Sequence, residues 1–151
     1  MLAGPGFQQS ERGQRSEFNT IVEMSRLLRE ARVTLYNINA FDPGSSAQLM
    51  RRDFYKSFLK PVKSAHEAQP GNLSVPVFAV HSGGRVYDAT GDLAALINNC
   101  VAETKIYYVL GFDPASAEHT DEYHELGVEV DKPGLKARTN AGYYAEPLAN
   151  P

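Results

Sequence analysis

The chain has 151 residues, of which 42% are hydrophobic and 22% charged, and its formal net charge at pH 7 is −3. These values are typical of one ordinary globular domain that is long enough to bury a core. The negative charge argues against a nucleic-acid-binding surface, and no apolar run approaches the ~20 residues that span a bilayer. The single cysteine, Cys100, excludes a disulfide within the chain.

The beginning of the chain is polar and rich in Gly, Gln and Ser, so we expect residues 1–19 to form a mobile N-terminal segment. Its first seven residues have neither the basic nor the apolar region of a signal peptide. A helix is predicted to begin at Thr20, where Glu23 completes a capping box. One face of this helix is apolar at helical spacing, with Ile21, Met24, Leu27, Leu28 and Ala31.

The next element is a predicted strand. Val33–Phe41 is β-branched and aromatic with little alternation, which is typical of a strand covered on both faces. A helix that leads into a buried strand through a very short turn indicates part of a doubly wound α/β sheet. Residues 45–73 give the weakest pattern: 47–59 has a helical composition, and Pro61 and Pro70 interrupt any continuation.

Three further elements are predicted before residue 106. Val75–Val80 is apolar and fits either a helix or a strand, although Pro76 argues against a central strand. The glycines after Ser82 predict a turn that leads into a short strand, Arg85–Tyr87. Asp92 lies in an N-cap region for an amphipathic helix. One side of that helix carries Leu93, Leu96, Ile97, Cys100 and Val101, so we expect Cys100 to be a buried structural cysteine.

The last third of the chain contains three β-rich runs, Ile106–Pro114, Tyr123–Val130 and Leu135–Ala145. Turn residues separate them, which predicts a small antiparallel β unit after the helix. Within these runs we expect the tyrosines to alternate between core and surface positions of strands. The tyrosines concerned are Tyr107, Tyr108, Tyr143 and Tyr144.

Four motifs follow one another in a specific order along the chain. They are Val33-Thr-Leu-Tyr-Asn-Ile-Asn, Ser82-Gly-Gly-Arg-Val-Tyr, Tyr108-Val-Leu-Gly-Phe-Asp-Pro and the closing Arg138-x-x-x-Gly-Tyr-Tyr-Ala. Together they resemble the C-terminal half of the von Willebrand factor A-related domain of the acidobacterial type. The resemblance covers residues 20–146 except for 45–73, which is then insertion-like. It implies a partial doubly wound sheet with flanking helices over 20–105 and, within the same domain, a C-terminal antiparallel β extension over 106–147.

The resemblance implies no metal ligand in this chain. The family's metal-ion-dependent adhesion site uses an Asp-x-Ser-x-Ser loop, a Thr from a later loop and an Asp before a Gly, because a hard divalent cation prefers oxygen ligands. The first two elements have no counterpart here, and the third falls at Pro5 if Gly6 matches the family's glycine. Asn140 also stands where the family usually has an Arg. We therefore expect no cofactor and a chain that corresponds to a truncated family member.

The function that the resemblance implies is that of a non-enzymatic protein-interaction module, an adhesion-type domain without a complete metal site and without catalytic residues. Its partner would be another protein, bound through the sheet edge, the β extension or the 42–73 region. A truncated sheet would leave the strand Val33–Asn39 without a neighbour, so we also expect self-association or poor solubility when the chain is made alone. Family members usually carry an export signal, which implies an extracytoplasmic parent protein.

A second hypothesis is a small α/β enzyme or ligand-binding domain with a cleft at the strand ends. Its residues would be Asn37, Asn39, Asp42 and Ser82. Two asparagines in an otherwise apolar strand are its only support, and hydrogen bonds to neighbouring loops explain them equally well. The one close pair of histidines, His119 and His124, lacks metal-ligand spacing, so we predict surface or hydrogen-bonded histidines there.

Overall fold

The computed structural model describes residues 10–39, 53–88 and 92–147. Its helices are α1 (Glu11–Glu30), α3 (Val75–His81) and α4 (Leu93–Glu103), and its strands are β1 (Tyr36–Asn39), β2 (Arg85–Asp88), β3 (Glu122–Glu125) and β4 (Gly142–Ala145). The described residues between β1 and α3 contain three 3₁₀ turns, η1 (Phe54–Phe58), η2 (Ala65–Glu67) and η3 (Pro70–Leu73). The predicted mixed α/β class is confirmed. No helix within these ranges has the length and apolarity needed to cross a membrane.

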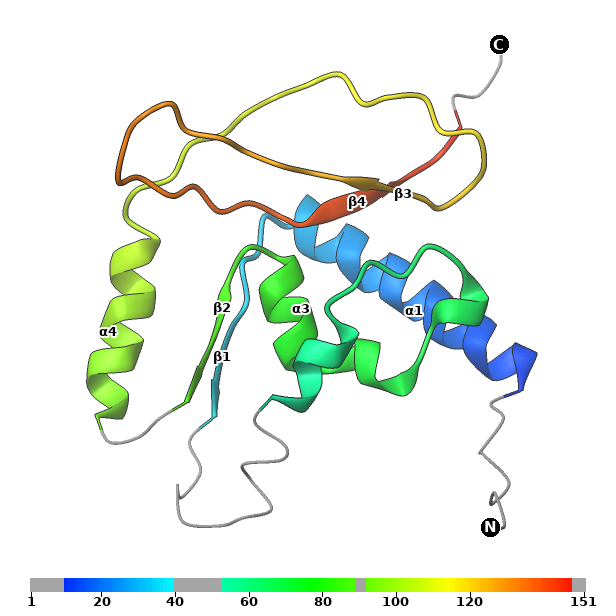
Figure 1. Ribbon diagram of the computed structural model, residues 1–151, viewed down its shortest axis with the longest axis horizontal. Helices are drawn as coiled ribbons and strands as arrows, with labels where there is room; N and C mark the ends of the chain where they lie inside the picture. The colour runs from blue at the N-terminus through cyan, green and yellow to red at the C-terminus, as the bar shows by residue number, and fades with distance from the viewer. Residues whose placement is uncertain (1–9, 40–52, 89–91, 148–151) are drawn as a thin grey trace.

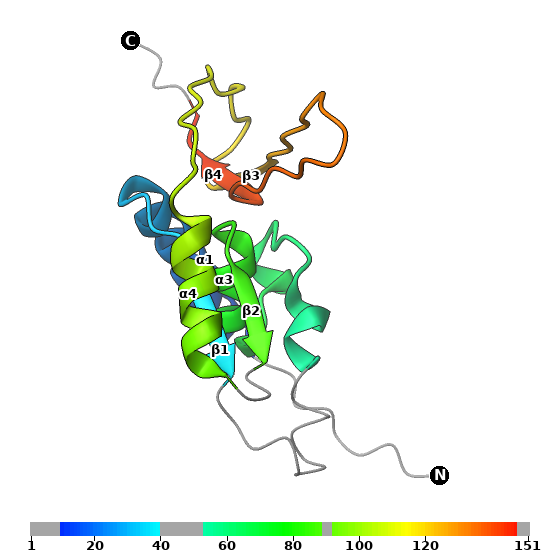
Figure 2. The same ribbon diagram turned by 90° about the vertical axis from the view of Figure 1, so that its left-hand side faces the viewer.

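The strands form two separate two-stranded sheets. β1 and β2 are parallel, with Tyr36 opposite Arg85 and Asn39 opposite Asp88. β3 and β4 are antiparallel, and they lie across one end of the unit formed by α1, α3, β1 and β2 (Figures 1 and 2). The antiparallel pairing predicted for the last two β-rich runs is therefore confirmed, although each strand is only four residues long.

Helix α1 begins at Glu11, so the prediction of a helix start at Thr20 is wrong. The N-cap is Ser10, whose hydroxyl oxygen accepts a hydrogen bond from the Gly13 amide at 3.2 Å. Thr20 lies inside the helix and donates its hydroxyl to the Ser16 carbonyl. The part of 1–19 that the structure describes is thus helical from Glu11 onward.

The main core lies between α1, α3 and the 3₁₀ segments. Its buried apolar side chains come from α1, from α3 and from the chain between the 3₁₀ turns: Ile21, Val22, Val62, Ala68, Val77, Phe78 and Ala79. Phe18, Leu73 and Tyr144 pack against this core from its edges. Residues 53–73, the described part of the insertion-like segment, therefore contribute core residues. Val75–Val80, which fitted helix or strand equally, lies in α3, with Pro76 in its first turn.

The turn predicted at Ser82-Gly83-Gly84 is confirmed, and two of its residues explain why. Gly83 has φ of +82°, a conformation that L side chains rarely adopt. A Cβ at Gly84 would lie 1.7 Å from the carbonyl oxygen of Leu35. The backbone of this turn therefore passes against Leu35, the residue before β1.

Three predictions about strands and burial are wrong. The strand predicted over Val33–Phe41 was expected to be covered on both faces, but β1 spans Tyr36–Asn39 and has no buried residue. The run Ile106–Pro114 forms no strand. The amphipathic helix exists as α4, capped by Asp92 through the Ala95 amide, but no residue of α4 is buried. Cys100 is consequently half-buried rather than fully buried. Apolar periodicity predicts a face of α4 that can be covered, and the described residues supply no cover on this side.

Candidate functional site

Among the described residues, the five most exposed large apolar side chains are consecutive, from Ile106 to Leu110. Ile106–Phe112, which we call the apolar segment, follows α4 and contains six large hydrophobic residues with exposed fractions of 59% to 85%. Monomeric proteins rarely leave such contiguous apolar surface in contact with water unless it binds something. The tyrosines of this run, Tyr107 and Tyr108, are therefore surface residues, and the predicted alternation between core and surface fails for them.

The backbone of the apolar segment is also unpaired. Within the described part of the chain, none of its N–H or C=O groups forms a hydrogen bond with another backbone group. The last turn of α4 ends just before the apolar segment, where the amides of Thr104 and Lys105 donate hydrogen bonds to the carbonyl oxygens of Val101 and Ala102. From there the chain runs away from β1 and β2 toward the β3–β4 hairpin (Figure 1).

The far end of the apolar segment is attached to the hairpin. The ring of Phe112 lies 5.8 Å from the ring of Tyr143, and Tyr143 forms a small buried cluster with Ala117 and Ala145. In β4 the predicted alternation between core and surface also fails, because Tyr143 is buried in the small cluster and the half-buried Tyr144 packs against the main core. Tyr144 donates its hydroxyl to the Val62 carbonyl at 2.9 Å, which ties the hairpin to the main core.

The near end of the segment is held by Glu103, the last residue of α4. Its carboxylate pairs with Arg85 of β2 at 3.2 Å and with Arg138 from the chain before β4, and it accepts a hydrogen bond from the Tyr87 hydroxyl. Burial opposes the charge of Glu103, yet the hydrogen bonds from Arg138 and Tyr36 prevail, so its pKa lies below the usual value. Sequence reasoning missed this cluster because nothing in the spacing of its residues marks it.

A second exposed apolar row lies on α4 itself. Leu93, Ile97 and Val101 follow one another at intervals of four residues and are 42% to 51% exposed. Residues four apart lie on one face of a helix. The row ends five residues before Ile106, so exposed apolar side chains continue from α4 into the apolar segment.

The small parallel sheet adds unpaired strand edges. In the described residues β1 and β2 have only each other as neighbours, which leaves one edge of each strand unpaired. An unpaired edge presents a row of N–H and C=O groups that can pair with another chain. We expected the strand Val33–Asn39 to lack a neighbour. In the described residues β1 has a neighbour, β2, at one edge and none at the other.

The residues of the alternative cleft do not converge. Ser82 lies at the start of the sheet, where its hydroxyl oxygen accepts from the Leu35 amide and its hydroxyl donates to the Ala79 carbonyl. Asn39 lies at the opposite end of β1, about 10 Å further along the strand. There Asn37 donates to Asn39, and Asn39 donates to Asp88. Asp42 lies outside the described residues.

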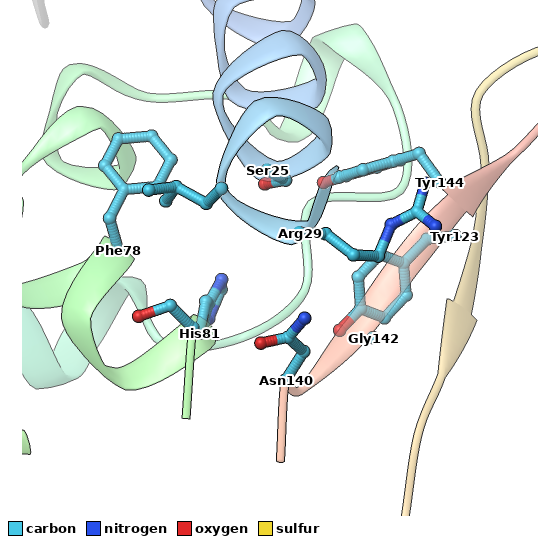
Figure 3. Close-up of a pocket in the computed structure, with 10 residues that line it drawn as sticks. Ser25, Arg29, Phe78, His81, Tyr123, Asn140, Gly142 and Tyr144 are labelled. Carbon is cyan, nitrogen blue, oxygen red and sulfur yellow. The ribbon is translucent and has the colours of Figure 1, made fainter. Parts of the chain in front are cut away.

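One small hollow lies between α1, α3 and the hairpin (Figure 3). Its volume is about 20 Å³, which gives room for about one water molecule. The polar side chains around it include Arg29, His81, Asn140 and Tyr123. The His81 ring nitrogen lies 3.1 Å from the Leu59 carbonyl. The size of the hollow does not favour a substrate site.

The two neighbouring histidines share one carboxylate. His119 is exposed and its Nδ1 lies 3.1 Å from Glu122 Oε2, so the prediction of surface or hydrogen-bonded histidines is confirmed for His119. It is wrong for His124, whose side chain is only 17% exposed and whose buried Nε2 lies 3.4 Å from Glu122 Oε1 without forming a hydrogen bond. Glu122 also accepts the Glu118 amide, and that hydrogen bond is the main reason why its pKa is lowered. Across the described ranges, no group of three or more His, Cys, Asp or Glu side chains is arranged to hold a metal ion. Pro5 lies outside these ranges.

Comparisons of the chain with protein-family models, with curated proteins and with solved structures found no match in any of the three.

Proposed function

We propose that the protein is a non-enzymatic interaction module that binds a protein partner through the apolar segment, Ile106–Phe112. The observation that carries the proposal is the run of six large apolar side chains that are 59% to 85% exposed, on a backbone without a pairing partner in the described residues. A partner that covers this segment would remove apolar side chains from water and satisfy backbone groups at the same time.

The recognition mode that fits these features is strand addition. An extended segment that pairs with a partner strand gains affinity from main-chain hydrogen bonds, and alternate side chains provide specificity. The residues of the apolar segment are suited to it, since Ile, Val, Tyr and Phe are enriched in strands. The exposed row on α4, Leu93, Ile97 and Val101, offers additional apolar contact next to the same segment.

We also propose that the chain is a partial doubly wound domain related to the von Willebrand factor A-like domains of the acidobacterial type. The parallel pair β1–β2, with α3 before β2 and α4 after it, supports this proposal. The antiparallel hairpin over residues 122–145 corresponds to the expected C-terminal extension.

Site-specific photo-crosslinking in cells tests the proposed function. Tyr108, which is 85% exposed, is replaced by p-benzoylphenylalanine, and Phe54, which is 63% exposed on η1, is replaced in the matched control. We expect a defined protein adduct from position 108 and none from position 54. The adduct should disappear when Val109→Asp is added, because a carboxylate in the centre of the segment opposes burial. No adduct at position 108, or equal adducts at both positions, would contradict the proposal.

A further inference from the structure

We infer that the partner of the apolar segment is a second copy of this chain, and that the two segments pair antiparallel around a two-fold axis at Val109. The inference rests on the proposed function, because it identifies the protein that the segment binds. A two-fold interface uses the same surface on both copies and closes as a dimer.

The exposed apolar area is large for a single segment. A buried aromatic side chain covers about 150–250 Å², and the segment presents three aromatic and three aliphatic side chains that are 59% to 85% exposed. Strand pairing buries the facing backbone edges and one flank of these side chains, whereas the two faces of the ribbon stay open. The exposed row on α4, Leu93, Ile97 and Val101, adds apolar area toward the ~800 Å² that one partner contributes to a standard interface.

The composition of the segment favours pairing with an identical strand. Ile106–Phe112 contains no charged residue and no proline, and segments with high β-propensity, low charge and no proline pair readily with copies of themselves. Its backbone forms no internal ladder in the described residues. A second copy therefore brings a matching row of donors and acceptors without placing like charges opposite each other inside the segment.

The flanking charges select one register. With Val109 opposite its own copy, Tyr107 faces Gly111 and Ile106 faces Phe112. The same register places Lys105 of each copy opposite Asp113 of the other, so that a pair of opposite charges closes each end of the ladder. Both residues are exposed, and neither forms an ion pair with a described residue. No other antiparallel register of the two segments places Lys105 opposite Asp113.

The attachments of the segment favour a second copy over the chain's own sheet. At the near end Glu103 pairs with Arg85 at the start of β2, and at the far end Phe112 contacts Tyr143 in the hairpin. Parallel pairing with the chain's own β2 would carry Phe112 toward the end of β2 at Asp88 and away from Tyr143. Pairing with another copy leaves both attachments in place.

Cysteine crosslinking tests the two-fold axis. In a Cys100→Ser background, Val109→Cys places two thiols opposite each other, where Cα atoms are about 4.5–5.5 Å apart, within the range for a disulfide. The matched control is Tyr107→Cys, because the two copies of position 107 are about 14 Å apart in this register. We expect disulfide-linked dimers to form at least tenfold faster from Val109→Cys. Equal rates, or no crosslink from Val109→Cys, would overturn the inference.

Charge reversal tests the register. Lys105→Glu and Asp113→Lys each place like charges opposite each other at both ends of the dimer, so each variant alone should dissociate at least fivefold more readily at low salt. An equimolar mixture of the two variants again has opposite charges facing at both ends. Analytical ultracentrifugation should therefore show dimers restored in the mixture. A mixture that dissociates as readily as the single variants would overturn the register, and assemblies that grow beyond a dimer would overturn the two-fold closure.

The two tests separate the inference from the proposed function. If the cysteine variants do not crosslink and photo-crosslinking at position 108 captures a different protein, the inference fails while the interaction function stands. If neither experiment yields an adduct, both fail. A self-adduct at position 108 together with rapid crosslinking of Val109→Cys supports both.

Discussion

Similar apolar residues are buried on one side of the molecule and exposed on the other. On the side of α1 and α3, Ile21 and Val77 are 4% and 1% exposed. Ile21 packs with Val62, Ala68 and Tyr144, and α3, which carries Val77, contacts β1, β2, η1 and η3. On the side of α4, Ile97 and Val101 are 47% and 51% exposed, and the apolar segment that follows is more exposed still. The comparison teaches that hydrophobic periodicity identifies a face to be covered, whereas the availability of a packing partner decides whether it is buried.

The largest predicted effect is a loss of stability on the side of α1 and α3, where the apolar side chains are buried. Gly84→Ala places a Cβ where the Leu35 carbonyl oxygen already lies, and both groups are backbone-bound and cannot move apart cheaply. We expect a loss of about 3 kcal/mol in the free energy of unfolding, measured by chemical denaturation. Gly127→Ala is the matched control, because a Cβ there meets nothing within 4 Å, and it should change stability by less than about 0.5 kcal/mol. Equal effects of the two substitutions would refute this account of the turn.

The same substitution made on both sides tests the comparison itself. Val77→Ala removes two buried methyl groups from the main core and should cost about 2 kcal/mol of unfolding free energy. Val101→Ala removes two half-exposed methyl groups from α4 and should cost less than about 0.5 kcal/mol. Thermal and denaturant unfolding of the purified variants measures both values. If Val101→Ala is as destabilising as Val77→Ala, then the apolar face of α4 is buried in solution, and the contrast between the two sides of the molecule is wrong.

A smaller effect is expected at the ion pairs that attach α4 to the rest of the molecule. The pKa of Glu103 is lowered in the folded state, so its carboxylate adds stability above the unfolded value of 4.5. That contribution is lost as the pH falls through the lower folded pKa. Glu103→Gln should therefore cost about 1 kcal/mol at pH 7 and progressively less below pH 4.5.

The control for this prediction is Glu129→Gln, since Glu129 is exposed. Its stability should follow that of the natural protein across the same pH range. A cost for Glu103→Gln that does not change between pH 7 and acid would show that the ion pairs with Arg85 and Arg138 contribute nothing to stability.

The smallest effect concerns the end of α1. Arg32 has φ of +54°, a conformation that glycine adopts without strain, and the Val33 amide closes the helix on the Leu28 carbonyl. Arg32→Gly should stabilise the protein by about 0.5–1 kcal/mol. Arg26→Gly, inside the same helix, should destabilise it by a similar amount. The opposite signs can be read from thermal unfolding, and two changes of the same sign would contradict the assignment of the helix end.

The sequence predicted those parts of the fold whose signals are local. The glycine turn at Ser82, the capped helix after Asp92 and the antiparallel pairing near Tyr143 follow from backbone conformation, capping and β-propensity. The start of α1 was missed because 11–19 is almost entirely polar, and its only large apolar residue, Phe18, does not establish a period. The exposure of the last helix could not be predicted, because it depends on what the rest of the chain leaves uncovered.

The candidate site was predictable only in part. Ile106–Phe112 stands out in the sequence as a β-rich run, and the sequence also predicted exposed apolar surface. Its location differs from the expectation, since the most exposed residues lie in this run rather than in Val33–Asn39. The cluster of Glu103 and Arg138 joins positions 35 residues apart by long side chains, which leaves no pattern in the sequence.

The most direct test of the account is amide hydrogen exchange of the natural protein, measured by mass spectrometry over a range of protein concentrations. Peptides that cover Ile106–Phe112 should exchange rapidly in dilute protein and become protected as the concentration rises, while α1 remains protected throughout. Protection of Ile106–Phe112 at the lowest concentration would mean that the segment is already paired within its own chain. Absence of protection at every concentration would mean that no second copy covers it, and either result would contradict the account.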